Sequence, residues 1–348
     1  MIETSMKLSR QLFLISLYLI SHGIVEAQIN QDSSQFRIKN TTAYIAEFFT
    51  TNSERQEYLF QPLGLFINST AAQFKKHHNF RIDAMLSYGA EPTANITRDL
   101  QTFSNIEAGF LFGFYQFYYQ YAKDKFWIKI GHQDINSDFL IPDYGLTFSH
   151  SSFGIDPVAT INMPAPTYPV SAMSITSQIR FNNHYTLRLG VFDGQFEEPN
   201  GDFLRLKTKL NKDEGYIILA EHQFSIFNNR WIAKLGNYYH SSLFYDYESN
   251  DTTRGQLSFY QINDIALLRK GKKEIGLFTQ FNASSVKVSQ LKYYVGTGLL
   301  IRNMLNLKAE NEMGLALGFV RVNNQYEEVE EQYAAVYEGV VEAQFKHR

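Results

Sequence analysis

The sequence predicts an all-β protein, an antiparallel β-barrel whose strands cross a membrane. Segments about ten residues long alternate between apolar and polar residues, which is the length that a tilted strand needs to cross a bilayer. Aromatic residues make up 15% of the chain, carried almost entirely by 29 Phe and 22 Tyr. Mean hydropathy is only −0.27, and no stretch beyond the N-terminus offers the roughly 20 apolar residues of a membrane-spanning helix. These observations favour strands with one face toward lipid and one toward a polar lumen.

The N-terminus predicts a secretory signal peptide at residues 1–27. Lys7 and Arg10 supply the positive charges, residues 12–20 form a short apolar core, and Val25-Glu26-Ala27 is a small-x-small cleavage pattern. An ordinary amphipathic helix is the alternative. Translation starts at Met1 or at Met6, and the sequence is compatible with both.

Residues 28–40 form a polar lead-in, which we expect on the periplasmic side, and residues 41–348 are expected to form the barrel. Short turn signals alternate with longer polar gaps, the layout of an outer-membrane barrel with its turns on the periplasmic side. A soluble β-sandwich shows the same period of two, but aromatic clusters at 118–127 and 238–245 favour interfacial girdles. The clearest alternating segments are 80–88, 185–191, 231–236, 274–282, 293–301 and 313–319.

Composition argues against several classes of function. A net charge of −3 does not favour nucleic acid, and the absence of Cys excludes thiolate zinc sites and disulfides. The His residues lack metal-ligand spacing, no nucleotide-binding loop is present, and no G-x-S-x-G elbow surrounds Ser151. We therefore expect no cofactor, no metal and no enzymatic activity.

One segment between predicted strands concentrates proline. It spans residues 156–173 and contains half of the chain's eight prolines: Pro157, Pro164, Pro166 and Pro169. Because proline fixes φ and lacks a backbone donor, this segment is predicted to be a stiff loop outside the sheet. Such a loop can fold into the lumen and constrict it, or lie on the outer rim, and the residues alone leave both open.

Motifs around this loop resemble the carbohydrate-selective porin family, OprB. They are a strand ending in Gly131, then Asn136-Ser137-Asp138-Phe139, then His150-Ser151-Ser152-Phe153-Gly154. Residues 100–107 and 191–194 also resemble this family, and weaker similarity continues to about Phe345. The resemblance implies a sixteen-stranded barrel in the outer membrane of a Gram-negative bacterium, through which small sugars diffuse.

The C-terminus departs from the family pattern. In the family, further strands follow the one that corresponds to 337–345, and the last one usually ends in an aromatic residue. This chain ends in Lys346-His347-Arg348. Two explanations stay open, a shorter barrel or a truncated reading frame. Missing strands would leave edges unpaired in lipid, at a cost of several kcal/mol for each unsatisfied backbone group.

Strand parity selects candidate pore-lining residues, because sugar hydroxyls pair with charged and amide groups. The candidates are Arg81, Asp83, Arg180, Arg188, Glu338 and Glu342. Charge pairs without any role in selectivity are the alternative. Inward-facing glycines such as Gly296 and Gly314 indicate either room in the lumen or contact with an inserted loop. The acidic run 327–331 is expected to be a solvated loop.

The predicted function is that of an outer-membrane porin for passive diffusion of small sugars and similar polar solutes. The alternative is a non-conducting structural or enzymatic barrel. The expected partners are small carbohydrates and outer-membrane lipid, without nucleic acid. Porins of this shape are often trimers, so a homotrimer is the assembly to test.

Overall fold

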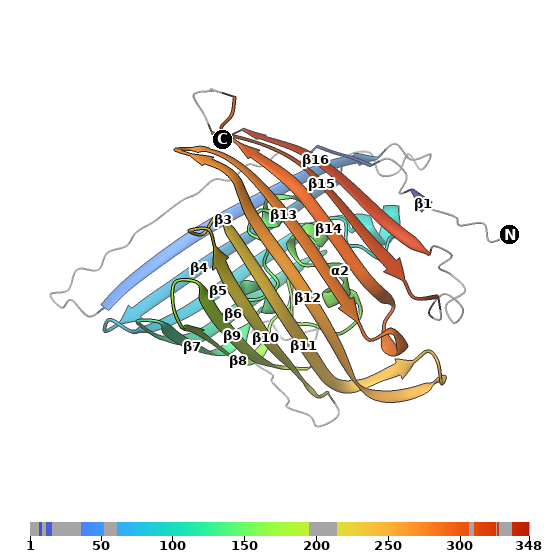
Figure 1. Cartoon of the computed structure of the whole chain (residues 1–348), viewed down its shortest axis with the longest axis horizontal. Coiled ribbons are helices and arrows are strands. Elements are labelled where there is room, and N and C mark those ends of the chain that lie inside the picture. The colour runs from blue at the N-terminus through green and yellow to red at the C-terminus, as the bar shows by residue number, and fades with distance from the viewer. Residues whose placement is uncertain are drawn as a thin grey trace.

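A computed structural model describes residues 7–8, 12–15, 36–51, 61–194, 214–305, 310–324, 326 and 336–347. Its strands form one sixteen-stranded sheet, and from β3 to β16 each strand pairs antiparallel with the next along the chain. Within the described residues, fourteen long strands roll up into the predicted antiparallel barrel (Figure 1), whereas the family resemblance implies sixteen. The long strands are β3 (Phe36–Thr51), β4 (Gln61–Phe74), β5 (His78–Gly89), β6 (Leu111–Lys123), β7 (Phe126–Gln133), β8 (Ala172–Arg180), β9 (Tyr185–Asp193), β10 (Tyr216–Ile226), β11 (Trp231–Asp246), β12 (Asp251–Lys270), β13 (Lys273–Ser284), β14 (Leu291–Arg302), β15 (Asn311–Val322) and β16 (Tyr337–His347).

Two short strands stand at the ends of the sheet order. β1 (Lys7–Leu8) pairs parallel with β16, and β2 (Leu12–Ile15) pairs antiparallel with β3. Both fall within the predicted signal peptide, whose other residues lie outside the described part of the chain. Of the predicted lead-in, residues 36–40 open β3 and the others are not described. Cleavage after Ala27 stays a prediction.

The barrel is apolar outside and polar inside, which confirms the predicted alternation. Large apolar side chains such as Phe259 and Leu315 are 57% and 53% exposed, whereas Glu221, Ser258 and Asn282 are fully buried on the inner face. None of the helices in the described residues is long and apolar enough to cross a membrane.

One residue of the predicted aromatic girdle, Tyr238, lies inside the barrel and not at its lipid-facing surface. Tyr238 is fully buried and packs against Tyr260 inside the barrel. Tyr238 and Tyr239 are neighbours in β11, and successive side chains of a strand point to opposite faces, so both cannot face lipid.

Short and long connections alternate between the two ends of the barrel. At the end with the short turns, 75–77, 124–125, 181–184, 227–230 and 271–272 each join two strands. The opposite end carries the first inserted loop, residues 90–110 between β5 and β6, and the second inserted loop, residues 134–171 between β7 and β8. The helical segments of the second inserted loop lie inside the barrel (Figure 1), and the one of the first inserted loop has no buried residue. These are η2 (Thr93–Thr97), η3 (Ile135–Ser137), η4 (Gly145–Thr147), α1 (Ser151–Gly154) and α2 (Pro157–Ile161). A further short helix, η5 (Val286–Val288), precedes β14.

Candidate functional site

The second inserted loop is held by carboxylates that project inward from the barrel wall. Asp264 on β12 accepts the backbone N–H groups of Asp143 and Tyr144 at 3.0 and 2.9 Å. Glu342 on β16 accepts those of Ser149 and His150 at 2.8 and 2.9 Å. Hydrogen bonds to an ionised acceptor are roughly twice as strong as neutral ones. Each carboxylate therefore fixes two successive peptide groups of a segment without regular secondary structure.

The first inserted loop is held in the same way. Glu338 on β16 accepts the N–H groups of Leu100 and Gln101, both at 2.9 Å. The hydroxyl of Ser104 donates to Glu47 on β3 at 2.6 Å. The sequence-predicted candidates Glu338 and Glu342 thus face inward, but their oxygens bind the inserted loops.

Aromatic side chains of the second inserted loop press against glycines of the wall. A Cβ added to Gly190 on β9 or Gly314 on β15 would lie 3.0 Å from Phe139 or 2.7 Å from Phe148, and one on Gly276 of β13 would meet the ring of Tyr144. Of the two explanations for inward-facing glycines, contact with an inserted loop applies to Gly314. Gly296 instead faces the ring of Tyr294 on its own strand.

Ion pairs line the inner face of the strands between the short turns and the loops. Arg81 bonds Asp83 at 2.9 Å, and Arg188 bonds Glu221 on β10 at 2.9 Å. A second guanidinium contact joins Arg188 to the carbonyl of Asp138 at 3.0 Å. The structure therefore brings three of the sequence-predicted candidates into inward-facing pairs.

Two lysines that sequence analysis did not single out complete this set. Lys129 on β7 bonds Asp138 of the second inserted loop at 2.8 Å, and Lys234 on β11 lies 3.8 Å from Asp264. Lys234 also donates to the carbonyl of Ile141. Lys234 lies in the alternating segment 231–236, but its partner in the loop could not be predicted from the sequence.

The proline-rich segment crosses the inside of the barrel. Pro157 is the first residue of α2, and the carboxylate of Asp156 just before it accepts the N–H of Ala159 at 3.1 Å. The same carboxylate accepts from the side-chain amide of Asn282 on β13 at 2.8 Å. Burial raises the pKa of Asp156 to about 6. Of the other prolines, Pro166 is buried, Pro164 is exposed, and Pro169 lines the first cavity defined below.

Burial also shifts two other groups of this loop. It lowers the pKa of His150 to about 4, so this imidazole is neutral near pH 7. It raises the pKa of Asp134 to about 7, although the hydroxyl of Tyr115 donates to that carboxyl. The described residues contain no group of His, Asp and Glu that could hold a metal ion.

Two cavities lie on opposite sides of the loops. The first cavity, about 730 Å³, lies between the two inserted loops and is lined by polar groups of Ser104, Asn105, Glu107 and Thr167, with the ring of Tyr168. The second cavity, about 570 Å³, lies at the short-turn end. Arg180 lines it together with Asn183, Gln223 and Asn228, so the structure separates this candidate from the other five.

A family model for the carbohydrate-selective porin, OprB family, matches residues 72–346. The chain belongs to this family. It is therefore an outer-membrane porin of the carbohydrate-selective class found in Gram-negative bacteria, and members of this family are not enzymes. A solved structure, the high-pH structure of Pseudomonas putida OprB, superposes with a TM-score of 0.73 at 14% identity. The match covers 85% of this chain and 78% of that one, and shows that the fold is shared. No curated protein matches the chain.

The OprB motifs lie where the two loops meet each other and the wall. The hydroxyl of Ser151 donates to the carbonyl of Thr102 at 2.6 Å, and that of Ser152 to the side chain of Gln101 at 3.0 Å. A Cβ on Gly154 would lie 2.8 Å from the side chain of Asn105.

The remaining motif residues are also used for structure. Gly131 has φ +142° at the end of β7, and a Cβ there would lie 2.7 Å from the Cα of Tyr118. Phe139 and Phe153 are fully buried, and the side chain of Asn136 donates to the carbonyl of Phe139 at 3.3 Å. The OprB motifs therefore specify how the loops are docked.

Proposed function

We propose that the two inserted loops form the constriction of this porin and that small sugars diffuse passively through the lumen beside them. The observation that carries the proposal is the fixation of both loops inside the barrel by paired hydrogen bonds to Glu338, Glu342 and Asp264. A loop fixed in this way is rigid enough to define a narrow passage.

The lining of the first cavity suits a polyhydroxylated solute. Carboxylate, amide and hydroxyl groups of Glu107, Asn105 and Thr167 can exchange hydrogen bonds with sugar hydroxyls, while the ring of Tyr168 offers an apolar face to C–H groups. We propose that Arg81, Asp83 and Arg188 line the pore between the inserted loops and the second cavity. Arg180 is proposed as a pore-lining group of the second cavity itself. The ion pairs of Arg81, Asp83 and Arg188 keep these side chains ordered. The side chains of Arg81 and Arg188 stay 44% and 20% exposed, whereas that of Asp83 is 2% exposed and acts by holding Arg81.

Liposome swelling tests the proposal directly. The purified chain is reconstituted, and influx of neutral sugars of graded size is compared with influx of amino acids of matched size. Fast swelling with monosaccharides and slower swelling with matched amino acids is expected. Equal rates for sugars and amino acids, or no swelling with demonstrably inserted protein, would refute the proposal. Protein-free liposomes supply the baseline.

We also propose that the porin assembles as a homotrimer, as barrels of this shape often do. Light scattering of the detergent-solubilised protein measures the mass of the assembly. A mass of a single chain after correction for detergent refutes the trimer without bearing on permeation.

A further inference from the structure

Two neighbouring short turns carry an exposed cluster of lysines. Lys75 and Lys76 lie in the turn between β4 and β5. Lys123 is the last residue of β6, and Lys125 lies in the turn between β6 and β7. The turns are joined by a hydrogen bond from the N–H of Ala122 to the carbonyl of His77 at 2.8 Å. All four lysines are exposed. Within the described residues, no carboxylate forms an ion pair with any of them.

An aromatic group lies directly beside this lysine cluster on the outer face of the barrel. The rings of Phe74 and Phe80 are 5.8 Å apart, Phe80 and Tyr119 are 5.1 Å apart, and His78 and Tyr121 are 5.3 Å apart. Phe80 is 47% exposed. Aromatic rings on the outside of a barrel mark the level at which acyl chains meet headgroups. The lysine cluster therefore stands at headgroup level, one turn beyond the edge of the hydrocarbon.

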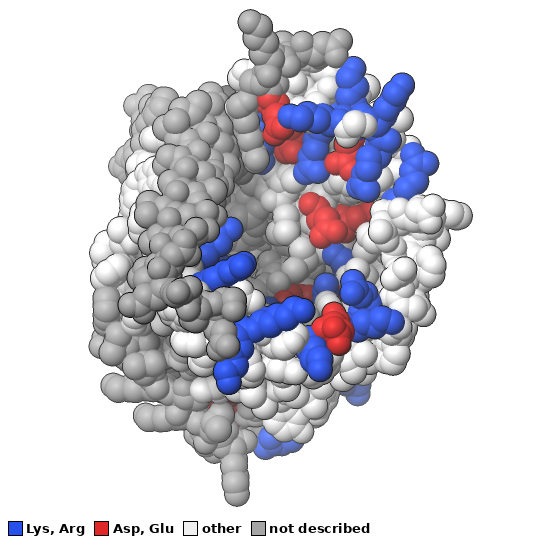
Figure 2. Space-filling model, turned by 90° about the vertical axis from the view of Figure 1, so that its left-hand side faces the viewer, with Lys and Arg blue, Asp and Glu red and all other residues white. Residues whose placement is uncertain are grey.

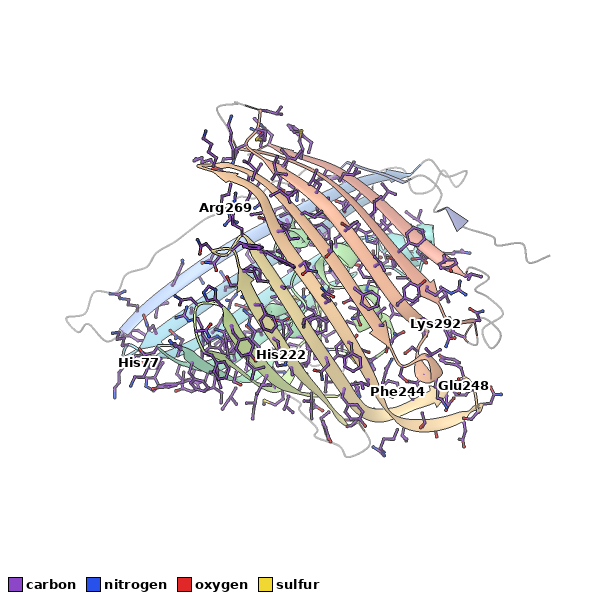
Figure 3. All side chains as sticks on the ribbon, in the orientation of Figure 1. His77, His222, Phe244, Glu248, Arg269 and Lys292 are labelled. Atoms are coloured by element: carbon purple, nitrogen blue, oxygen red, sulfur yellow. The ribbon has the colours of Figure 1, made fainter. Side chains whose placement is uncertain are left out.

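The rest of the short-turn end is also basic. Figure 2 views the molecule from the side on which His77 lies in Figure 3, and Lys and Arg side chains ring the hollow there. Two acidic residues near these turns are already paired, Glu274 with Arg269 at 2.8 Å and Glu310 with Lys272 at 3.1 Å. By contrast, residues 134–171, which fold in from the opposite end, contain four Asp and neither Lys nor Arg.

We propose that the lysine cluster binds the headgroup of an anionic phospholipid of the periplasmic leaflet. Short turns of outer-membrane barrels face the periplasm, where that leaflet consists of phospholipid. Basic residues near a membrane surface attract anionic lipids. A phosphodiester without a compensating amine, such as that of phosphatidylglycerol, suits a cluster whose two turns contain a single acidic residue, Asp124. The acyl chains would then lie against Phe74, Phe80 and Tyr119.

The test measures association of spin-labelled phosphatidylglycerol with the full-length porin in phosphatidylcholine bilayers, relative to spin-labelled phosphatidylcholine. The test variant is Lys75→Gln/Lys76→Gln/Lys123→Gln. Lys125 is kept because its ammonium donates to the carbonyl of Phe181 at 3.2 Å and ties two turns together. The matched control, Arg254→Gln/Lys287→Gln/Lys292→Gln, removes equal charge from the other end of the barrel, where Lys292 lies (Figure 3).

The wild-type porin is expected to prefer the anionic lipid by on the order of fivefold for each lysine that contacts the headgroup. The preference should fall in the test variant to at most the roughly fivefold that the retained Lys125 can supply. It should persist in the control and weaken in 1 M salt, where the screening length falls to about 3 Å. Equal preference in the wild type and the test variant, or equal loss in both variants, would overturn the proposal. Sugar-dependent swelling of the test variant is expected to match the wild type, so failure of lipid binding is distinguishable from failure of the porin function.

Discussion

Replacing Glu338 and Glu342 together by alanine should release the inserted loops from β16. The two carboxylates accept four backbone N–H groups between them, all at 2.8 to 2.9 Å. A hydrogen bond to a charged group contributes about 1.5–3 kcal/mol. At the lower figure the double variant loses about 6 kcal/mol, which corresponds to about four decades in the ratio of docked to undocked loop.

The two loops should not respond equally. The second inserted loop keeps the bonds to Asp264, the ion pair of Asp138 with Lys129 and its buried aromatic anchors. The first inserted loop keeps the hydrogen bond from Ser104 to Glu47 and its contacts with the second loop. We therefore expect the first loop to undock first, which opens the lumen beside β16 and β3.

Liposome swelling and single-channel conductance measure this release. The variant should admit larger sugars than the wild type does, and its conductance should rise. Glu338→Gln/Glu342→Gln keeps one carbonyl oxygen per side chain as an acceptor. Its size limit and conductance should therefore lie between those of the wild type and those of the alanine variant. Glu312→Gln is the matched control, because Glu312 on β15 pairs with Arg302 and not with a loop. An unchanged size limit and conductance in the folded alanine variant would refute the assignment of these glutamates as loop anchors.

Three further predictions concern the packing of the second inserted loop, its pH dependence and the N-terminus of the mature chain. Gly276→Leu should displace the ring of Tyr144, cost about 1–3 kcal/mol and lower the temperature at which the barrel unfolds on gels, whereas Gly339→Ala on β16, where an added Cβ would meet nothing closer than 3.5 Å, should change it less. The pKa of Asp156 is raised from 3.8 to about 6, so its contribution to docking is complete below the lower value and lost as pH rises through the upper one. Current fluctuations should therefore be greater at pH 8 than at pH 5, and Asp156→Asn should reduce that difference, to which the raised pKa of Asp134 also contributes. Intact mass of the outer-membrane form should place its N-terminus at Gln28, and retention of residues 1–27 would contradict the predicted signal peptide.

The barrel could be predicted from the sequence because the alternation of apolar and polar residues within each strand depends only on neighbouring residues. Alternation with period two, as in 313–319, fixes which side chains face lipid without reference to any other part of the chain. The loop contacts are not local. The partners of Glu338 lie more than 200 residues away in sequence at Leu100 and Gln101, and no pattern along the chain pairs them. Parity could place Glu338 on the inner face, but it could not distinguish a side chain that lines water from one that holds a loop.

The OprB motifs and the solute-facing groups are largely different residues. Ser152, Phe153 and Gly154 are buried where the loops meet. The first cavity is lined mainly by residues outside those motifs, such as Thr167 and Tyr168. A family whose members share the docking contacts can therefore keep the constriction in place while the lining residues change. Specificity among sugars should accordingly be altered by substituting Thr167 or Tyr168, whereas substitution of Phe153 should impair the constriction for every solute.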